Sequence, residues 1–497
     1  MATTLAAEQL PIDNIDATLA QHPFGDRAYI TEQMHVSYRR RLDKLSVHMP
    51  VAGQLLEALH RLEPYGQYRI LGDTVVRCAV QHAQVQVETA TPYGLPLEQC
   101  EEVFTETVRA IREGRYAPLG SGLKNRVGPD PHHGWIWDEQ GAGSVFEQAF
   151  HYILQIDYGE ERPCTPDADE VAMLQRGARL LSLLLPQSCR SALSHAHLAA
   201  VFPEIGAWRT RLSSSEFRIS GTVFLSRRLL TNPWRAAEHL YHEALHQQYY
   251  DIRAGHLLLQ SGFARQGAPL IHSLWNRPDA TRNSYWDIHR AVAAFHVYVH
   301  LALLCTAAEQ NVPVQNEFGP VQMVGRRTAL VRAHYLGEQI RKVAWEELGP
   351  AGKRFVDWFE SVLELLDPSP PAPGADVHLL LDRYWGEARA VRSLPTEQLP
   401  QARDRLTTLA LAGDEVQRTR RILAAMSENT SSFDEAMAGL SKRDPIEYFV
   451  SVRWLIANTI LTASPENFRL SESGIPDGLV RQMVEDSSEV LRPLLDR

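Results

Sequence analysis

The sequence predicts an α+β protein that is predominantly helical, with a central metal-binding domain between two helical regions. Apolar residues recur at helical spacing through most of the chain, for example over 28–45, 97–113 and 171–185. Strand-like runs are short and confined to the middle of the chain, at 197–202, 208–212 and 217–225. These runs lead into a helix that carries two histidines four residues apart. Strands next to a metal-bearing helix indicate a mixed central domain.

Three regions follow from this pattern. The first 190 residues form an N-terminal helical region, and residues 191–366 form the domain with the strands and the histidine pair. The proline-rich stretch 367–374 is typical of an extended linker. We expect a C-terminal helical region over 376–497.

Composition excludes several classes of protein. Of 497 residues, 44% are hydrophobic and 22% charged, which is ordinary for a soluble domain protein. The net charge of −10 argues against a nucleic-acid or anionic-membrane binder. Five scattered cysteines without a C-x-x-C pair, and an N-terminus unlike a signal peptide, favour a cytoplasmic location. The apolar stretch 291–308 is long enough to span a membrane, but two internal histidines favour a buried core helix.

The most informative stretch is Tyr241-His242-Glu243-Ala244-Leu245-His246. On a helix the two imidazoles lie on one face, where both can hold a single metal ion. Asn232 is a good helix cap and Pro233 suits the first turn, so the pattern lies within a well-bounded helix. An H-E-x-x-H pattern also arises by chance, but apolar neighbours that bury the other face favour a metal site.

The remaining ligand decides the chemistry. A metzincin needs His or Asp six residues after His246, and Ile252 occupies that position. A thermolysin-like enzyme needs a downstream glutamate, and none occurs between Glu243 and Glu309. Glu309 or Glu317 still allows a zinc peptidase.

A second helix offers histidines instead. His289, His296 and His300 follow at i, i+7 and i+11, on one helical face. We expect His289 as the third metal ligand, with His296 in reserve. The alternative is a hydrogen-bonded cluster of core histidines.

The central region resembles the α-ketoglutarate-dependent HExxH-type peptide β-hydroxylases, bacterial enzymes that modify ribosomally made precursor peptides. Three pieces carry the resemblance: the strand 220–225, the motif helix 240–247, and the stretch from Leu274-Trp275-Asn276-Arg277 through Arg282 to His289. It extends over about 191–366.

The resemblance implies iron(II) as the metal, with α-ketoglutarate and O2 as co-substrates. His242, His246 and the downstream histidine would leave positions open for both. The distal carboxylate of α-ketoglutarate needs a cation, which is best supplied by a bidentate arginine. The candidates are Arg282, Arg290 and Arg332. Glu243 would then orient a ligand or water, or contact the substrate.

We therefore expect an iron(II)/α-ketoglutarate-dependent dioxygenase that hydroxylates a residue of a precursor peptide, at the β-carbon. The alternatives are a zinc metallopeptidase with Glu243 as general base and a non-enzymatic scaffold with structural histidines. The flanking helical regions would frame a groove for the peptide or form a homodimer. We expect no nucleic acid and no membrane among the partners.

Overall fold

The protein is predominantly helical with a few short strands, as predicted: 68% of the computed structural model is helix and 5% is strand. The described residues are 12–139, 143–209, 211–276, 285–368, 377–395, 397, 405–426, 430–462 and 475–495. Most of the predicted linker therefore lies outside the described residues.

The chain divides into two compact units, and neither is a continuous stretch. The first unit consists of Met1–Ser261, His296–Ala329 and Leu348–Leu366. The second consists of Gly262–Phe295, Leu330–Glu347 and Asp367–Arg497. The region predicted as the metal-binding domain, 191–366, contributes to both units.

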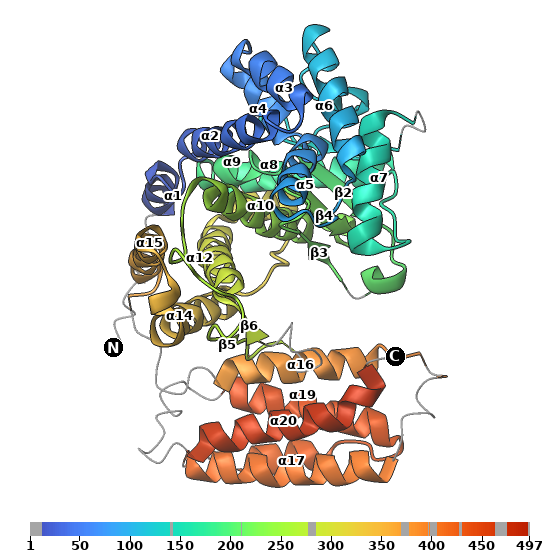
Figure 1. Cartoon of the computed structure of the whole chain (residues 1–497). Coiled ribbons are helices and arrows are strands. Elements are labelled where there is room, and N and C mark those ends of the chain that lie inside the picture. Colours follow the sequence, from blue (N-terminus) through green and yellow to red (C-terminus); the bar gives the residue numbers. More distant parts are fainter. Residues whose placement is uncertain are drawn as a thin grey trace. The chain divides into compact units, whose positions relative to one another are not determined.

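Most helices of the first unit come from the front half of the chain (Figure 1). The helices that lie wholly in this unit are α1 (Ile12–Gln21), α2 (Arg27–Ser46), α3 (Pro50–His60), α4 (Pro64–Gly72), α5 (Thr74–Thr89), α6 (Leu97–Arg112), α7 (Val145–Tyr158), α8 (Ala168–Leu184), α9 (Ser188–Leu193), α10 (Pro233–Gly255), α13 (Val312–Phe318) and α15 (Pro350–Leu366). Short 3-10 turns are η1 (Gly120–Gly122), η2 (Gly206–Arg209) and η3 (Arg227–Thr231). Two helices, α12 (Ile288–Gln310) and α14 (Arg326–Val343), begin in one unit and end in the other.

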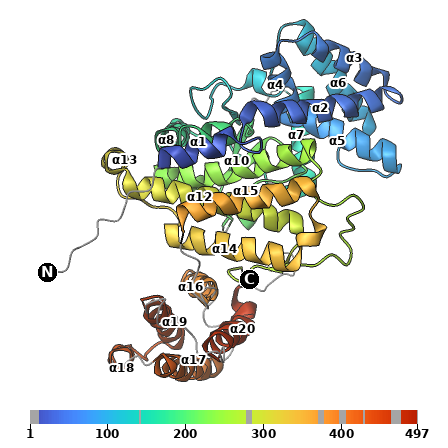
Figure 2. The same cartoon turned by 90° about the vertical axis from the view of Figure 1, so that its left-hand side faces the viewer.

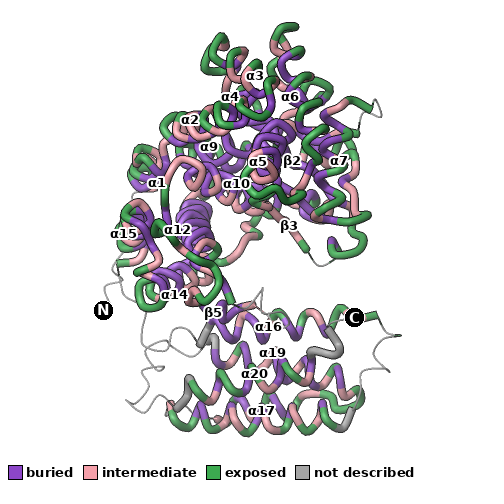
Figure 3. The backbone as a smooth tube through the Cα atoms, viewed as in Figure 1, coloured by how far each residue is buried: buried purple, intermediate pink, exposed green. Residues whose placement is uncertain are grey.

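A small sheet lies in the first unit, with strand order β1-β2-β4-β3 among the described residues. The strands are β1 (Trp135–Ile136), β2 (Leu198–Phe202), β3 (Ser213–Ser214) and β4 (Thr222–Ser226). Strands β1, β2 and β4 are parallel, and β3 is an antiparallel edge. Every residue of β2 and β4 is buried, as expected for parallel strands covered on both faces (Figure 3). Leu198, Ala200 and Phe202 belong to the large core that α2 to α7 also line.

Helix α10, which carries the histidine pair, packs against β4, α8 and α2. Its approach to α8 depends on Gly177, where an added Cβ would lie 3.0 Å from the backbone nitrogen of Ala237. The C-terminal part of α12 lies beside α10, with the ring of Tyr249 6.3 Å from that of His296. Helix α15 lies on α12 in turn, as Figure 2 shows, and Phe359 is 5.1 Å from His296 between ring centroids. The metal-motif helix is thus held from several sides.

Two predicted strands differ from the structure. The run 208–212 was predicted as a strand, but 206–209 is the 3-10 turn η2, because the Trp208 N–H donates to the Ile205 carbonyl and its ring stacks on Phe202 at 4.4 Å. The run 217–225 forms a strand only from residue 222. Gly221 has φ of +89°, a conformation that interrupts a strand. The predicted strand at 197–202 is confirmed as β2.

The second unit contains a hairpin and a helical bundle. Strand β5 (Ile271–His272) pairs antiparallel with β6 (Tyr285–Trp286). The short η4 (Trp345–Glu347) follows α14. The bundle contains α16 (Val377–Arg392), α17 (Arg405–Ala425), α18 (Ser431–Ala438), α19 (Pro445–Thr462) and α20 (Ile475–Leu495). In Figure 1 the long helices α16, α17, α19 and α20 run side by side in orange and red.

Helix α12 has the length and composition of a membrane span, and it is the one such helix within the described residues. The qualifying part is wholly buried inside the protein. This burial agrees with the predicted core helix.

Candidate metal centre

Helix α10 is built to hold its side chains in fixed positions. Asn232 caps its first turn by accepting hydrogen bonds from the backbone nitrogens of Trp234 and Arg235, at 2.9 and 3.3 Å. Pro233 occupies the first helical turn, as the sequence predicts. The helix continues to Gly255, so the histidine pair lies well inside it.

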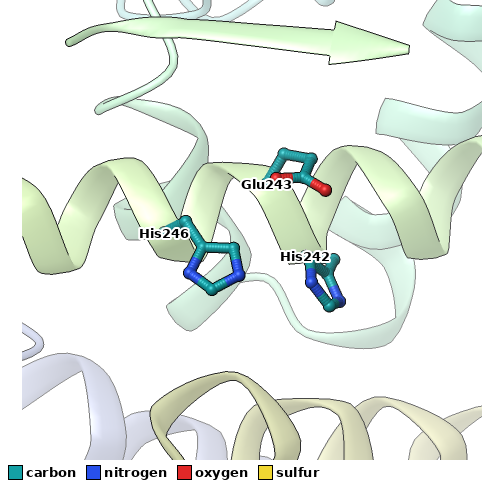
Figure 4. A group of neighbouring side chains, drawn as sticks. All are labelled: His242, Glu243 and His246. Carbon is teal, nitrogen blue, oxygen red and sulfur yellow. The ribbon is translucent and has the colours of Figure 1, made fainter. Parts of the chain in front are cut away.

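His242, Glu243 and His246 form a group that fits a metal ion. One ligand atom from each lies within 4.8 Å of those of the other two. The two imidazole rings are 5.0 Å apart between centroids and inclined at 65°. Both histidines are partly exposed, and Figure 4 shows the two rings on neighbouring turns of one helix. The structure thus brings the predicted pair together, as two ligands from one helix require.

Glu243 differs from its neighbours because it is only 3% exposed. The Ser215 hydroxyl donates a 2.6 Å hydrogen bond to its Oε2 atom. In Figure 4 the carboxylate lies above the two imidazoles. It is therefore anchored by the chain that follows β3, close to the space between the two histidines.

Three residues of this region, His239, Ser213 and Ser215, were not predicted from the sequence. His239 lies one turn before His242 on the same face of α10, with ring centroids 6.5 Å apart. Its Nδ1 atom is 2.8 Å from the hydroxyl of Ser213 in β3. The i−3 spacing is visible in the sequence and would have identified His239. The serines carry no such signal, because only pairing of β3 with β4 brings them to α10.

The two candidates for a third ligand lie in different units. His289 belongs to the second unit, is partly buried, and has its ring 6.1 Å from that of Phe263. His296 belongs to the same unit as the motif and is fully buried. Among the described residues, neither ring nitrogen of His296 has a hydrogen-bond partner. Burial lowers the pKa of His296 well below its usual value, and His300, His246 and His195 add to the shift. The three-residue metal group does not include His289 or His296.

The arginines expected to bind α-ketoglutarate also fall outside the motif's unit. Arg332 lies 3.5 Å from Asp382 and stacks over Trp275 at 5.1 Å. Arg290 is exposed at the start of α12, with its guanidinium 4.9 Å from the Trp286 ring centroid. Arg282 lies outside the described residues.

Of the two glutamates that could serve a thermolysin-like enzyme, one is exposed and the other is engaged in an ion pair. Glu309 is exposed near the end of α12. Glu317 forms an ion pair with Arg179 at 2.8 Å. Neither belongs to the metal group found among the described residues. Ile252, at the metzincin position, is 1% exposed and packed in the core.

A buried polar network supports the second half of α10. Asp251 forms an ion pair with Arg77, and its other carboxylate oxygen lies 2.7 Å from Nδ1 of His195. All three side chains are about 1% exposed. Burial opposes ionisation of Asp251, but Arg77 and His195 hold the pKa of its carboxyl below the usual value. This network ties α5 and the end of α9 to the metal-motif helix.

Comparison with known proteins adds no assignment, since no protein-family model and no curated protein matches this chain.

Proposed function

We propose that the protein is an iron(II)/α-ketoglutarate-dependent oxygenase that hydroxylates a residue of a precursor peptide at its β-carbon. The observation that carries the proposal is the metal group on α10, with the ligand atoms of His242, Glu243 and His246 within 4.8 Å of one another. The ion pair of Glu317 with Arg179 argues for an oxygenase over a thermolysin-like peptidase that would use Glu317.

The donor set suits iron(II), because imidazole is a common ligand of iron in oxygenases. His242 and His246 would hold the metal from one side, and a third histidine would complete a face. His289 is the ligand implied by the family resemblance. His296 is the alternative, since its unpartnered, buried nitrogens lie in the same unit as the motif. Iron(II) with α-ketoglutarate and O2 supplies an oxidant strong enough to remove hydrogen from an unactivated C–H bond.

The protein's own groups would then position the reactants. Glu243, held by Ser215, would orient a water or the peptide beside the metal. An arginine would bind the distal carboxylate of α-ketoglutarate through paired hydrogen bonds; Arg282, Arg290 and Arg332 are the candidates.

A test uses the full chain loaded anaerobically with iron(II), then given α-ketoglutarate, O2 and the small peptide encoded beside its gene. We expect succinate release and a peptide heavier by one oxygen atom, both measured by mass spectrometry. The His242→Ala variant is the inactive control. A peptide of unchanged mass with no succinate formed would overturn the proposal.

A zinc metallopeptidase is the second candidate, favoured by the position of the Glu243 carboxylate within reach of both histidine ligand atoms. In that mechanism Glu243 is the general base that activates a metal-bound water. This candidate predicts shortened peptide products with zinc alone, without O2, and their loss in Glu243→Gln. Full cleavage by Glu243→Gln would remove it.

A further inference from the structure

A separate hollow lies in the first unit, at the start of the parallel strands. It has a cavity volume of about 20 Å³, and about 290 Å³ when the space open to solvent is included. Its lining comes from the α4–α5 junction, from the glycine-containing loop before η1, and from the first residues of β1 and β2. The lining residues that matter are Arg69, Asp73, Thr74, Gly120, Trp135 and His197.

Two side-chain nitrogens of this hollow have no hydrogen-bond partner within the described part of the chain, and the Arg69 guanidinium lies beside them. Arg69 is only 6% exposed, and no hydrogen bond or ion pair joins its guanidinium to a described residue. Its recorded contact is with the Trp135 ring, 5.3 Å from the guanidinium carbon. The indole nitrogen of Trp135 is buried without a partner within the described part of the chain. The same holds for Nε2 of His197, itself 6% exposed.

The acceptors in the hollow, by contrast, are already used. Asp73 accepts hydrogen bonds from the backbone nitrogens of Val75, Val76 and Leu119, at 3.1, 3.4 and 2.7 Å. The Thr74 hydroxyl is 2.8 Å from that of Thr222. The backbone N–H groups in the first turn of α5 thus already donate to Asp73, so they are not available to bind a ligand. What remains is an excess of N–H donors around one cationic side chain.

Leaving a buried donor unsatisfied costs about 1–3 kcal/mol, and more for a charged group. Two such nitrogens, Trp135 Nε1 and His197 Nε2 in its N–H tautomer, are therefore expected to have a partner that supplies acceptors beside the Arg69 guanidinium. A guanidinium prefers the oxygens of a carboxylate or a phosphate, which bind its paired N–H groups.

We infer that this hollow binds a compact oxyanion, the carboxylate or phosphate group of a small ligand, through Arg69, Trp135 and His197. The cavity exceeds the ~10–15 Å³ that one water requires, and it is continuous with space open to solvent. Gly120 allows the arrangement, because a Cβ at this position would lie 2.3 Å from the Trp135 indole nitrogen. The site is independent of the metal group on α10 and does not depend on the proposed reaction.

The test measures thermal unfolding of the full, metal-free chain at constant ionic strength, titrated with inorganic phosphate, acetate or chloride. We expect a saturable rise in melting temperature with phosphate or acetate over chloride, because a ligand that binds only the folded state stabilises it. The oxyanion with the lower apparent Kd identifies the source of the group. In Arg69→Gln we expect the affinity to fall by about tenfold or more, since a charge-assisted hydrogen bond is lost.

Arg126→Gln is the matched control, because Arg126 contacts the same indole ring but does not line the hollow. It should retain the affinity to within about threefold, as expected for a screened charge near the surface. If Arg69→Gln fails to fold, Trp135→Phe tests the same site by removing the indole N–H together with one of the two fused rings, and binding should weaken. Equal responses to phosphate, acetate and chloride would overturn the inference. So would equal losses in Arg69→Gln and Arg126→Gln, or unchanged binding in Trp135→Phe when Arg69→Gln does not fold.

Discussion

Two polar regions of this protein, one in each unit, show opposite ways of placing charge inside a helical fold. In the bundle of the second unit, Glu387 and Glu415 are balanced by Arg383 and Arg453, with every side chain about 1% exposed. Arg453 lies 3.3 Å from Glu415 and 3.5 Å from Glu387. The network joins α16, α17 and α19, and charge is offset within it.

The bundle network extends to hydroxyl groups. Tyr384 donates a 2.5 Å hydrogen bond to Glu415, and Ser488 on α20 donates one of 2.7 Å to Glu387. A buried network of this kind specifies which helix faces meet, and replacing one member leaves an uncompensated charge. Its role is structural.

The first unit places a group of metal-ligating side chains where solvent reaches it. The His242–Glu243–His246 group faces partly to solvent, and both nitrogens of His296 lack partners among the described residues. Unsatisfied groups lower the stability of the folded state, and they are retained where they bind something. The difference is one of charge balance and access. The bundle pairs buried carboxylates with buried arginines, whereas the metal group of the first unit is open to solvent.

The largest expected effect is on metal binding. In His242→Ala, iron or zinc content measured by mass spectrometry should fall to background, because one of two ligands on the helix is removed. The melting temperature of the metal-free protein should change little, since His242 is partly exposed. His239→Ala is the control, because His239 lies outside the metal group and should retain the metal. Undiminished metal in His242→Ala would favour structural histidines.

Substitutions in the buried network of the bundle should change the stability of the protein rather than its metal content. Arg453→Met leaves the buried Glu415 without an arginine partner and should destabilise the second unit by about 3–5 kcal/mol in urea unfolding. Arg418→Met is the comparison, because its partners Asp414 and Asp486 are 44% and 40% exposed. That variant should cost at most about 1 kcal/mol. Equal losses in the two variants would contradict a structural role for the buried network.

Acid should distinguish the two units. Burial lowers the pKa of His35 and of His82 to about 4, with nearby arginines adding to both shifts. Because the unfolded chain has a histidine pKa near 6.5, it binds more protons than the folded state between about pH 6.5 and 4. Stability is therefore full above pH 6.5 and falls as pH drops toward 4, by up to about 3 kcal/mol for each histidine.

Hydrogen exchange at pH 7 and 5, corrected for intrinsic rates, checks this difference. Protection should fall in α5 peptides and persist in α17 and α19, which contain no histidine. His82→Gln is the diagnostic variant, because an amide oxygen can still accept the Leu95 N–H that His82 Nδ1 accepts at 3.0 Å. Unchanged acid sensitivity in His82→Gln would exclude His82 as a source of the loss of stability at low pH.

The smallest expected effect concerns the serine that holds Glu243. Ser215→Ala removes a 2.6 Å hydrogen bond and should cost about 1 kcal/mol in stability, with metal content unchanged. Ser213→Ala is the matched control, since Ser213 contacts His239 and not Glu243. Loss of metal in Ser215→Ala alone would indicate that Glu243 is itself a ligand.

Much of the local structure could be predicted from the sequence. The caps at Asn232 and Pro233, the histidine spacing on α10 and the buried helix over 291–308 all follow from interactions within a few residues. The prediction of a strand at 208–212 was wrong, because the stacking of Trp208 on Phe202 overrides the local sequence pattern.

The sequence by itself determined a predominantly helical chain with two histidines on one helical face, since helix periodicity and capping are local properties. Tertiary structure alone decided which groups surround them. Ser215 meets Glu243 only because β3 pairs with β4, and Arg69 meets Trp135 only because α4 packs over the start of the sheet. Contacts between residues so far apart in the chain depend on packing of the whole unit, which no local pattern encodes.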